Sequence, residues 1–446
     1  MDTPICDFVT AYALSGTSRF HMPGAKGVPC HGLESIDITE IKGAGYLYSE
    51  EGIIAQSEKN ASLLFGSGRT LYSTEGSSLS IKAMLLNAVA SLGSGDRALI
   101  LAPRNVHKAF IDAAALIDFD AAWIMPQKPL GTICQAYITP EDVSKALLSL
   151  DRKPTAVYIT SPDYLGLMLD VKGIKKVCSQ HGIPLLVDNA HGAYLRFLEK
   201  SLHPLDMGAD MCCDSAHKTL PVYTGGGYLH INAAADKRLF DNPKGKMPVF
   251  ASTSPSYIIM QSLDNCNRIL SEEFPARLET AVRQVIKVKS GIRDMGYDLI
   301  GNEPMKISIL TSSFGISGDA LAQHLRENGV ECEYSDEFSL VLMPSVYNTQ
   351  EDYDKLLFAL SLVSPGKADI KEPLALPCPE TRMSIRQGMF SDAENVPADC
   401  ALGRVCACGA VSCQPSIPIA ISGEVITDKT IRIMKEYGIK EISVVK

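Results

Sequence analysis

Short apolar runs alternate with amphipathic stretches through the middle of the chain. Most of these runs lack the two-residue alternation of a strand that has one face in solvent. Continuous apolarity is typical of strands covered on both faces, as in a parallel sheet flanked by helices. Because amphipathic stretches such as Pro140–Leu150 and Val171–His181 lie between the runs, the order is β-α-β and predicts a doubly wound α/β domain. The predicted strands are Ala98–Ala102, Ala121–Met125, Ala156–Thr160, Pro184–Val187, Ala209–Cys213 and Gly227–Ile231.

The pattern changes after about Asp264. Arg277–Met295 predicts one long helix of mixed charge that leads out of the large domain. A linker rich in Pro and Lys is expected at Ser364–Pro379, and a third unit from Arg382 to Lys446 ends in a helix and a strand. We therefore predict domains at 1–275, 276–365 and 366–446, the last two of α+β type. The second is expected to contain strands at Met305–Leu310, Glu331–Tyr334 and Leu340–Met343 and helices at Gly318–Asn328 and Gln350–Leu362.

The composition is that of a globular protein without a nucleic-acid or membrane partner. The net charge is −9 and the sequence pI is about 5.6, so no basic surface is expected to attract nucleic acid or an anionic membrane. No apolar run approaches the roughly 20 residues that a membrane-spanning helix needs. The first ten residues lack the basic and apolar regions of a signal peptide. These features predict a cytoplasmic enzyme.

The thirteen cysteines allow two interpretations. The tightest group is Cys400, Cys406, Cys408 and Cys413, which suggests a metal site. Its irregular spacing and the lack of a nearby His favour scattered reduced thiols instead. We predict no metal site.

Polar residues follow several predicted strands, where ligands bind in open α/β sheets. Asp188 ends the run that begins at Pro184; it is either a turn or helix-capping residue or a partly desolvated carboxylate that needs a cationic partner. Lys218 lies between an apolar run and the glycine triplet Gly225–Gly227. It is either a surface charge or an amine suited to act as a Schiff-base nucleophile.

A run of small hydroxyl residues precedes a third apolar helical stretch. Ser73–Ser80 contains Gly76, Ser77 and Ser78 just before Ile81–Leu92. Such a helix start offers unpaired N–H groups and a positive dipole end to an anion, although the same residues serve equally well as plain helix caps. With His107 as a flat ring for stacking, Asp188 as an acid and Lys218 as an amine, the set is typical of one phosphate-bearing cofactor.

These residues lie in motifs that resemble the Orn/Lys/Arg decarboxylases. This family comprises group III pyridoxal-phosphate (PLP) enzymes of fold type I, and the chain resembles its short bacterial form. The resemblance covers nearly the whole chain. The motifs that carry it are Phe20-His21-Met22-Pro23-Gly24, Asp37-Ile38-Thr39-Glu40, Glu75-Gly76-Ser77-Ser78, Arg104-Asn105-Val106-His107-Lys108, Ser161-Pro162-Asp163-Tyr164-Leu165-Gly166, Asp188-Asn189-Ala190-His191-Gly192-Ala193, Ser215-Ala216-His217-Lys218-Thr219-Leu220, Thr253-Ser254-Pro255-Ser256-Tyr257, Ile417-Pro418 and Gly423-Glu424.

The resemblance implies a large domain like that of aspartate aminotransferase, with a mostly parallel seven-stranded sheet. Lys218 would carry pyridoxal 5'-phosphate as an internal Schiff base, and Asp188 would pair with the pyridinium nitrogen. His107 would stack on the ring, and His191 would lie near its other side or near its phenolic oxygen. Ser252 would reach the phosphate of the partner subunit, because the site would lie at the interface of a homodimer, which could assemble further. The cofactor contacts implied in this way are Gly76, Ser77, Ser78, His107, Asp188, His191, Ser215, His217, Lys218 and Ser252.

The implied reaction is decarboxylation of arginine, lysine or ornithine, giving CO2 and an amine of polyamine metabolism. The cofactor ring would absorb the carbanion left by CO2, and the protonated ring nitrogen facing Asp188 would stabilise that charge. Glu424 is the candidate partner for the distal cation of the substrate.

The chain departs from the family pattern at Ala25, at Gly45-Tyr46-Leu47-Tyr48 and in the glycine triplet Gly225–Gly227. These changes leave the cofactor prediction intact and the substrate open. One alternative is a fold type I enzyme that acts on another amino acid, as a different decarboxylase, an aminotransferase or a lyase. Another is a catalytically silent cofactor-binding protein, against which intact Lys218, Asp188 and His107 argue.

Overall fold

A seven-stranded, mostly parallel sheet forms the centre of the fold. The computed structural model describes residues 1–446 except 93–96, 126–135, 368–378 and 412–416. The strand order is β1-β7-β6-β5-β4-β2-β3. β5 and β6 are parallel, and β7 runs antiparallel to both of its neighbours, β6 and β1. The strands are β1 (Arg69–Ser73), β2 (Leu99–Pro103), β3 (Asp120–Ile124), β4 (Ala156–Thr160), β5 (Leu185–Asp188), β6 (Met211–Asp214) and β7 (Gly227–Ile231).

The described chain divides into two compact units. The first comprises Met1–Ile100, Leu150–Ile159 and Val171–Pro275, and the second comprises Leu101–Ser149, Thr160–Asp170 and Ala276–Lys446.

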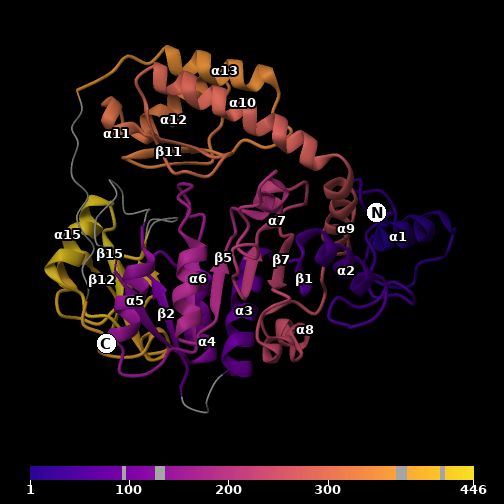
Figure 1. Ribbon diagram of the computed structural model, residues 1–446, viewed down its shortest axis with the longest axis horizontal. Helices are drawn as coiled ribbons and strands as arrows, with labels where there is room; N and C mark the ends of the chain where they lie inside the picture. Colours follow the sequence, from indigo (N-terminus) through magenta and orange to yellow (C-terminus); the bar gives the residue numbers. More distant parts are fainter. Residues whose placement is uncertain (93–96, 126–135, 368–378, 412–416) are drawn as a thin grey trace. The chain divides into compact units, whose positions relative to one another are not determined.

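In the first unit, the helices pack on the sheet and on one another. α3 packs on β6 and β7, while α2 packs on the edge strand β1 and against α1 and α9 (Figure 1). Asp264 of α9 accepts the backbone N–H groups of Ile5 and Cys6 at 2.8 and 2.9 Å, which fixes the start of α1. The helices, with the short 3-10 turns, are α1 (Pro4–Leu14), α2 (Ile53–Phe65), α3 (Gly76–Leu92), α6 (Val171–Gln180), η1 (Ala193–Phe197), α7 (Ala216–Thr219), η2 (Lys237–Phe240), α8 (Pro243–Lys246), η3 (Met247–Phe250) and α9 (Tyr257–Glu272).

A second sheet, of order β10-β11-β9-β8, lies in the second unit. α12 packs on β11 and α13 (Figure 1), and the hydroxyl of Tyr297, which lies between α10 and β8, donates to the carbonyl of Leu360 in α13. α4 (Lys108–Ile117) and α5 (Pro140–Ser149) also belong to this unit. The elements of the smaller sheet and its helices are α10 (Phe274–Asp294), β8 (Asp298–Ile300), β9 (Ile307–Leu310), α11 (Thr311–Phe314), α12 (Gly318–Glu327), β10 (Tyr334–Ser335), β11 (Ser339–Leu342) and α13 (Gln350–Ser361).

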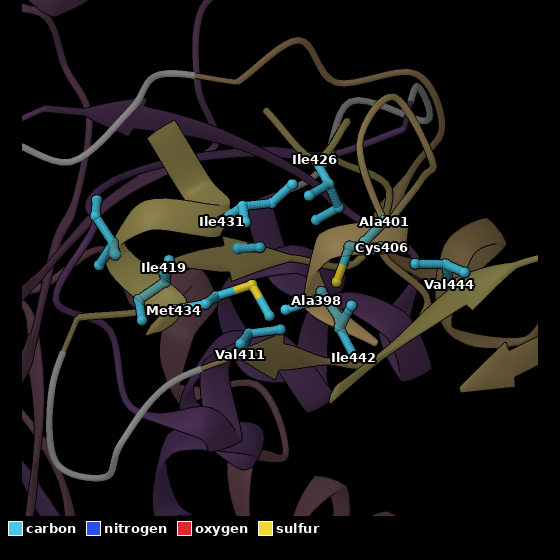
Figure 2. Packing of buried hydrophobic residues seen from close by; sticks show 12 residues of the cluster. Ala398, Ala401, Cys406, Val411, Ile419, Ile426, Ile431, Met434, Ile442 and Val444 are labelled. Atoms are coloured by element: carbon cyan, nitrogen blue, oxygen red, sulfur yellow. The ribbon is translucent and has the colours of Figure 1, made fainter. Parts of the chain in front are cut away.

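The C-terminal part of the second unit has its own apolar core. Figure 2 shows Ile419, Ile431 and Met434 among the buried side chains that meet there. β12 pairs with β15, and β13 pairs with β14, both antiparallel. The elements are α14 (Ile385–Met389), β12 (Ala393–Pro397), η4 (Ala398–Cys400), β13 (Ala410–Val411), β14 (Ala420–Ile421), α15 (Asp428–Glu436) and β15 (Glu441–Val445).

The predicted α/β fold is confirmed, with local differences. β1 was not predicted, because its sequence Arg-Thr-Leu-Tyr-Ser carries polar residues. The strand predicted at Glu331–Tyr334 is wrong in place, since β10 begins only at Tyr334. Most of the predicted linker at Ser364–Pro379 lies outside the described residues. The division into three domains stays a prediction.

In the described part of the chain, no helix combines the length and apolarity needed to cross a membrane.

Candidate active site

Two adjacent parallel strands of the first unit bring Asp188 and Lys218 to the same edge of the sheet. Asp188 is the last residue of β5 and pairs in register with Cys213 of β6. The chain then turns through Ser215 into α7, which carries Lys218. The Lys218 Nζ lies 2.9 Å from the Nε2 of His191, which follows β5. The structure therefore places an amine, an imidazole and the end of a buried strand together, as the predicted site requires.

The Asp188 carboxylate is buried and surrounded by donors. Its side chain is 2% exposed. The Tyr158 hydroxyl donates to Oδ2 at 3.2 Å, and the Ala190 N–H donates to Oδ1 at 3.1 Å. The Cys213 thiol lies 3.7 Å from Oδ1. The bond to Ala190 is the turn interaction that the first interpretation of Asp188 predicts, and the bond to Tyr158 joins the middle of β4 to the end of β5.

The start of α3 lies close to the glycine triplet Gly225–Gly227. Gly76 opens the helix with a φ of +65°, and its N–H donates to the Gly225 carbonyl at 2.6 Å. A Cβ on Gly227 would lie 3.0 Å from the Asp214 carbonyl oxygen, so the glycine triplet lets β6, β7 and α3 meet. Ser77 and Ser78 lie in the first turn of α3, where N–H groups have no carbonyl partner within the helix.

Three further predicted residues lie around this helix start in the first unit. Ser215 is 1% exposed and occupies the cap position of α7. His217 Nδ1 lies 3.0 Å from the Gly226 carbonyl oxygen and is assigned as its donor, since a carbonyl oxygen only accepts. Ser252 is exposed, and its backbone N–H donates to the Glu75 carboxylate at 2.7 Å.

The two remaining predicted residues, His107 and Glu424, belong to the second unit. His107 caps α4, because its Nδ1 accepts the Ala109 N–H at 3.1 Å. Glu424 is 2% exposed, and both of its carboxylate oxygens are bound by Arg104, which is 1% exposed. Arg104 Nε also donates to the Pro418 carbonyl at 3.2 Å. The bonds to Arg104 give Glu424 a structural role that competes with its predicted contact to substrate.

The sequence interpretation missed a polar cluster behind the strand ends. Asp214 accepts hydrogen bonds from Asn189, His203 and His230, all in the first unit. The position of Asp214 directly before Ser215 was the available signal. His203 and His230 had none, because only the folded chain brings them to Asp214. Among the described residues, His203, Asp214 and His230 form the one group whose ligand atoms cluster as a metal site would require; Cys413 lies outside the described residues.

The residues present fit pyridoxal 5'-phosphate. An N–H-rich helix start with two serines suits a phosphate, a buried carboxylate suits a protonated ring nitrogen, and a half-buried lysine amine suits its aldehyde carbon. The packed glycines leave room for the backbone to approach such a ligand.

Comparison with known proteins supports this assignment. The family model described as "Orn/Lys/Arg decarboxylase, major domain" matches residues 3–300. Arginine decarboxylase of Halalkalibacterium halodurans is 30% identical, with 97% of this chain and 93% of that protein covered. The constitutive lysine decarboxylase of Escherichia coli is 23% identical, over 70% of this chain and 50% of that protein. The solved structure of the lysine decarboxylase of Francisella novicida superposes with a TM-score of 0.82, over 100% of this chain and 81% of that chain. At 17% sequence identity, this match shows a common fold.

These matches confirm the predicted fold type, the cofactor and the reaction class. The chain is a decarboxylase that uses pyridoxal 5'-phosphate, and the alternative of an aminotransferase or lyase is not favoured. The chain belongs to the Orn/Lys/Arg decarboxylase family.

Proposed function

We propose that the chain decarboxylates arginine, releasing CO2 and the corresponding amine. The observation that carries the site is the 2.9 Å approach of Lys218 Nζ and His191 Nε2 beside the strand end of Asp188. The choice of arginine is supported by relatives named arginine decarboxylase that are 26% to 30% identical to this chain. Each match covers more than nine-tenths of this chain and of the relative. Lysine and ornithine are the competing substrates.

Each residue predicted to contact the cofactor would have a role in holding it. Lys218 would bind it covalently, and Asp188 would face its ring nitrogen. Ser77, Ser78 and Ser215 would bind the phosphate, and Gly76, which has no side chain, would let it approach the start of α3. His217 would hold the glycine triplet beside this phosphate-binding site through its hydrogen bond to the Gly226 carbonyl. His107 and His191 would lie on the ring, and Ser252 would reach the phosphate held by a partner subunit.

The cofactor, when bound, supplies an electron sink for the charge that remains when CO2 leaves. Asp188 accepts bonds from Tyr158 and Ala190, and these bonds would hold its carboxylate in place to face the ring nitrogen. His191 Nε2 is placed to take a proton from the Lys218 ammonium group. Lys218 must lose that proton before its nitrogen can act as a nucleophile.

We also propose that the protein is a cytoplasmic homodimer. Its chain would form three domains, at 1–275, 276–365 and 366–446. The dimer is supported by apolar side chains in the N-terminal segment: Phe20 is 95% exposed and Met22 is 62% exposed. Such groups commonly lie at interfaces between subunits. Sedimentation of the wild type and of Phe20→Ser tests the dimer, since the variant should shift towards the monomer.

The direct test is CO2 release from arginine, lysine and ornithine, measured in parallel on the cofactor-loaded enzyme. Arginine should give a kcat/KM at least about tenfold above the other two, and Lys218→Ala should lose at least about a thousandfold of it. Lys108→Ala is the matched control, because Lys108 pairs with Asp112 on the exposed face of α4. Absence of CO2 from all three amino acids, with cofactor bound, would overturn the proposal; preference for lysine or ornithine would overturn the choice of arginine.

A further inference from the structure

A buried polar cluster of the first unit lies directly behind the strand end that leads to Lys218. His203, Asp214 and His230 are each 0% exposed. The Nε2 atoms of His203 and His230 lie 3.0 and 3.2 Å from the Asp214 Oδ2. The cluster is either a metal site or a set of hydrogen bonds that converge on one carboxylate.

The second nitrogen of each imidazole decides between these two possibilities. His203 Nδ1 accepts the Leu205 N–H at 3.4 Å, so the proton that this ring donates to Asp214 lies on Nε2. His230 Nδ1 lies 2.8 Å from the Thr70 hydroxyl, which serves as its donor. A metal would need a lone pair on Nε2, which would leave the His203 ring without either proton. The geometry therefore supports hydrogen bonds.

The charge state follows from the same contacts. Burial alone would raise the pKa of Asp214, but the interactions with His203 and His230 outweigh it and hold that pKa well below its usual range. Burial lowers the pKa of His230, which keeps its imidazole neutral. Asp214 is therefore an ionised carboxylate on which several hydrogen-bond donors converge.

A third donor connects this carboxylate to the other strand end of the site. The Asn189 side-chain Nδ2 donates to Asp214 Oδ1 at 2.6 Å, and the Asn189 N–H donates to the Cys213 carbonyl at 2.9 Å. Asn189 directly follows Asp188, and Asp214 directly precedes Ser215. One carboxylate therefore ties the segment of Asp188 and His191 to the segment of Ser215 and Lys218.

We propose that Asp214 is a positioning residue for the cofactor site, acting through Asn189 and through the segment that it starts. This inference rests on the proposed roles of Asp188 and Lys218. The position requires a group that only accepts hydrogen bonds, because three donors converge on it. An amide of the same shape would turn an NH2 group towards at least one of them.

The test compares Asp214→Asn with the matched control Asp264→Asn. Asp264 is also a 0% exposed carboxylate with three donors, Ile5, Cys6 and Ser57, but its bonds fix the start of α1. Asp214→Asn should weaken cofactor binding and lower kcat by about 10- to 100-fold each, with the KM for the amino acid little changed. Asp264→Asn should lower the melting temperature comparably while cofactor affinity and kcat stay within about twofold of wild type.

Asn189→Ala keeps the inference testable if Asp214→Asn does not fold. It removes only the bond between the two segments and should reproduce the loss of cofactor affinity, and the double variant should be no worse than Asp214→Asn alone. Wild-type cofactor affinity in folded Asp214→Asn, or in Asn189→Ala, would overturn the inference. Equal losses of cofactor affinity and kcat in Asp264→Asn would also overturn the inference, because they would show that the effect comes from lower stability. Cofactor affinity is measured without substrate, so a failure of the proposed reaction would be seen separately.

Discussion

Asp214, the last residue of β6, and Asp163, which follows β4, are both buried aspartates, yet their pKa values shift in opposite directions. Asp214 is 0% exposed and has three side-chain donors. Asp163 is 3% exposed; its Oδ1 accepts the Leu167 N–H at 2.8 Å, and its Oδ2 has no hydrogen-bond partner among the described residues. Burial raises the pKa of Asp163 to about 7, and the Leu167 N–H and the Lys306 ammonium group offset only part of that rise.

The contrast shows that burial alone does not set the charge of these groups, because the two imidazoles that contact Asp214 outweigh its burial while the partners of Asp163 do not. Asp214 can serve as a permanent anion that holds other segments. Asp163 is a neutral acid at slightly acidic pH and becomes an anion as the pH rises. Three substitutions test or extend this contrast, beginning with the one that should have the largest effect.

Glu424→Ala extends the contrast to a carboxylate whose partner is a full positive charge. The substitution leaves the buried Arg104 guanidinium without its counterion, so we expect a loss of about 3–5 kcal/mol of unfolding free energy, measured by urea denaturation. The matched control is Glu279→Ala, which removes an exposed partner of Arg283 and should cost less than about 1 kcal/mol. Similar costs for the two variants would contradict this account of the buried pair.

Gly192→Ala acts on Asn189, the donor that joins Asp214 to the other strand end. An added Cβ would lie 2.1 Å from Asn189 Oδ1, so Asn189 must move. We expect a loss of about 1–3 kcal/mol in unfolding free energy and a weaker affinity for the cofactor. The control is Gly291→Ala, at a glycine inside α10 whose added methyl group would lie 3.4 Å from Leu357. This substitution should leave the unfolding free energy unchanged or raise it. Unchanged cofactor affinity in Gly192→Ala would show that Asn189 is not needed in its place.

Asp163→Asn tests the opposite sign of the two pKa shifts. A raised folded pKa gives stability that is complete below the unfolded value of 3.8 and is lost as the pH rises through about 7. Asp163 should therefore contribute a fall of up to about 1.4 kcal/mol per pH unit in the unfolding free energy between these values. Asp163→Asn should flatten that part of the stability curve. Asp214→Asn should instead flatten the acid limb, because a depressed pKa gives stability that is lost as the pH falls below the unfolded value. A wild-type pH profile in Asp163→Asn would refute the raised pKa.

Much of the large sheet could be predicted because its strands are continuous apolar runs. The predicted Ala156–Thr160 and Gly227–Ile231 coincide with β4 and β7. The edge strand β1 was not predicted, because its composition does not mark it as a strand. Arg69–Ser73 becomes a strand through its pairing with β7.

The candidate site shows the same limit. Asp188 and Lys218 could be placed together, since both follow strands of one sheet. His203, Asn189 and His230 could not be assigned to Asp214, because side chains far apart along the chain meet only after the sheet has formed. The Arg104–Glu424 pair was missed for the same reason, and it changes how Glu424 is interpreted.

The most direct test of the central claim is to identify the lysine that carries the cofactor. Borohydride reduction of the cofactor-loaded enzyme, followed by digestion and peptide mass analysis, should place the cofactor mass on the peptide that contains Lys218. The cofactor mass on another lysine, such as the buried Lys244 that pairs with Glu58, would contradict the account.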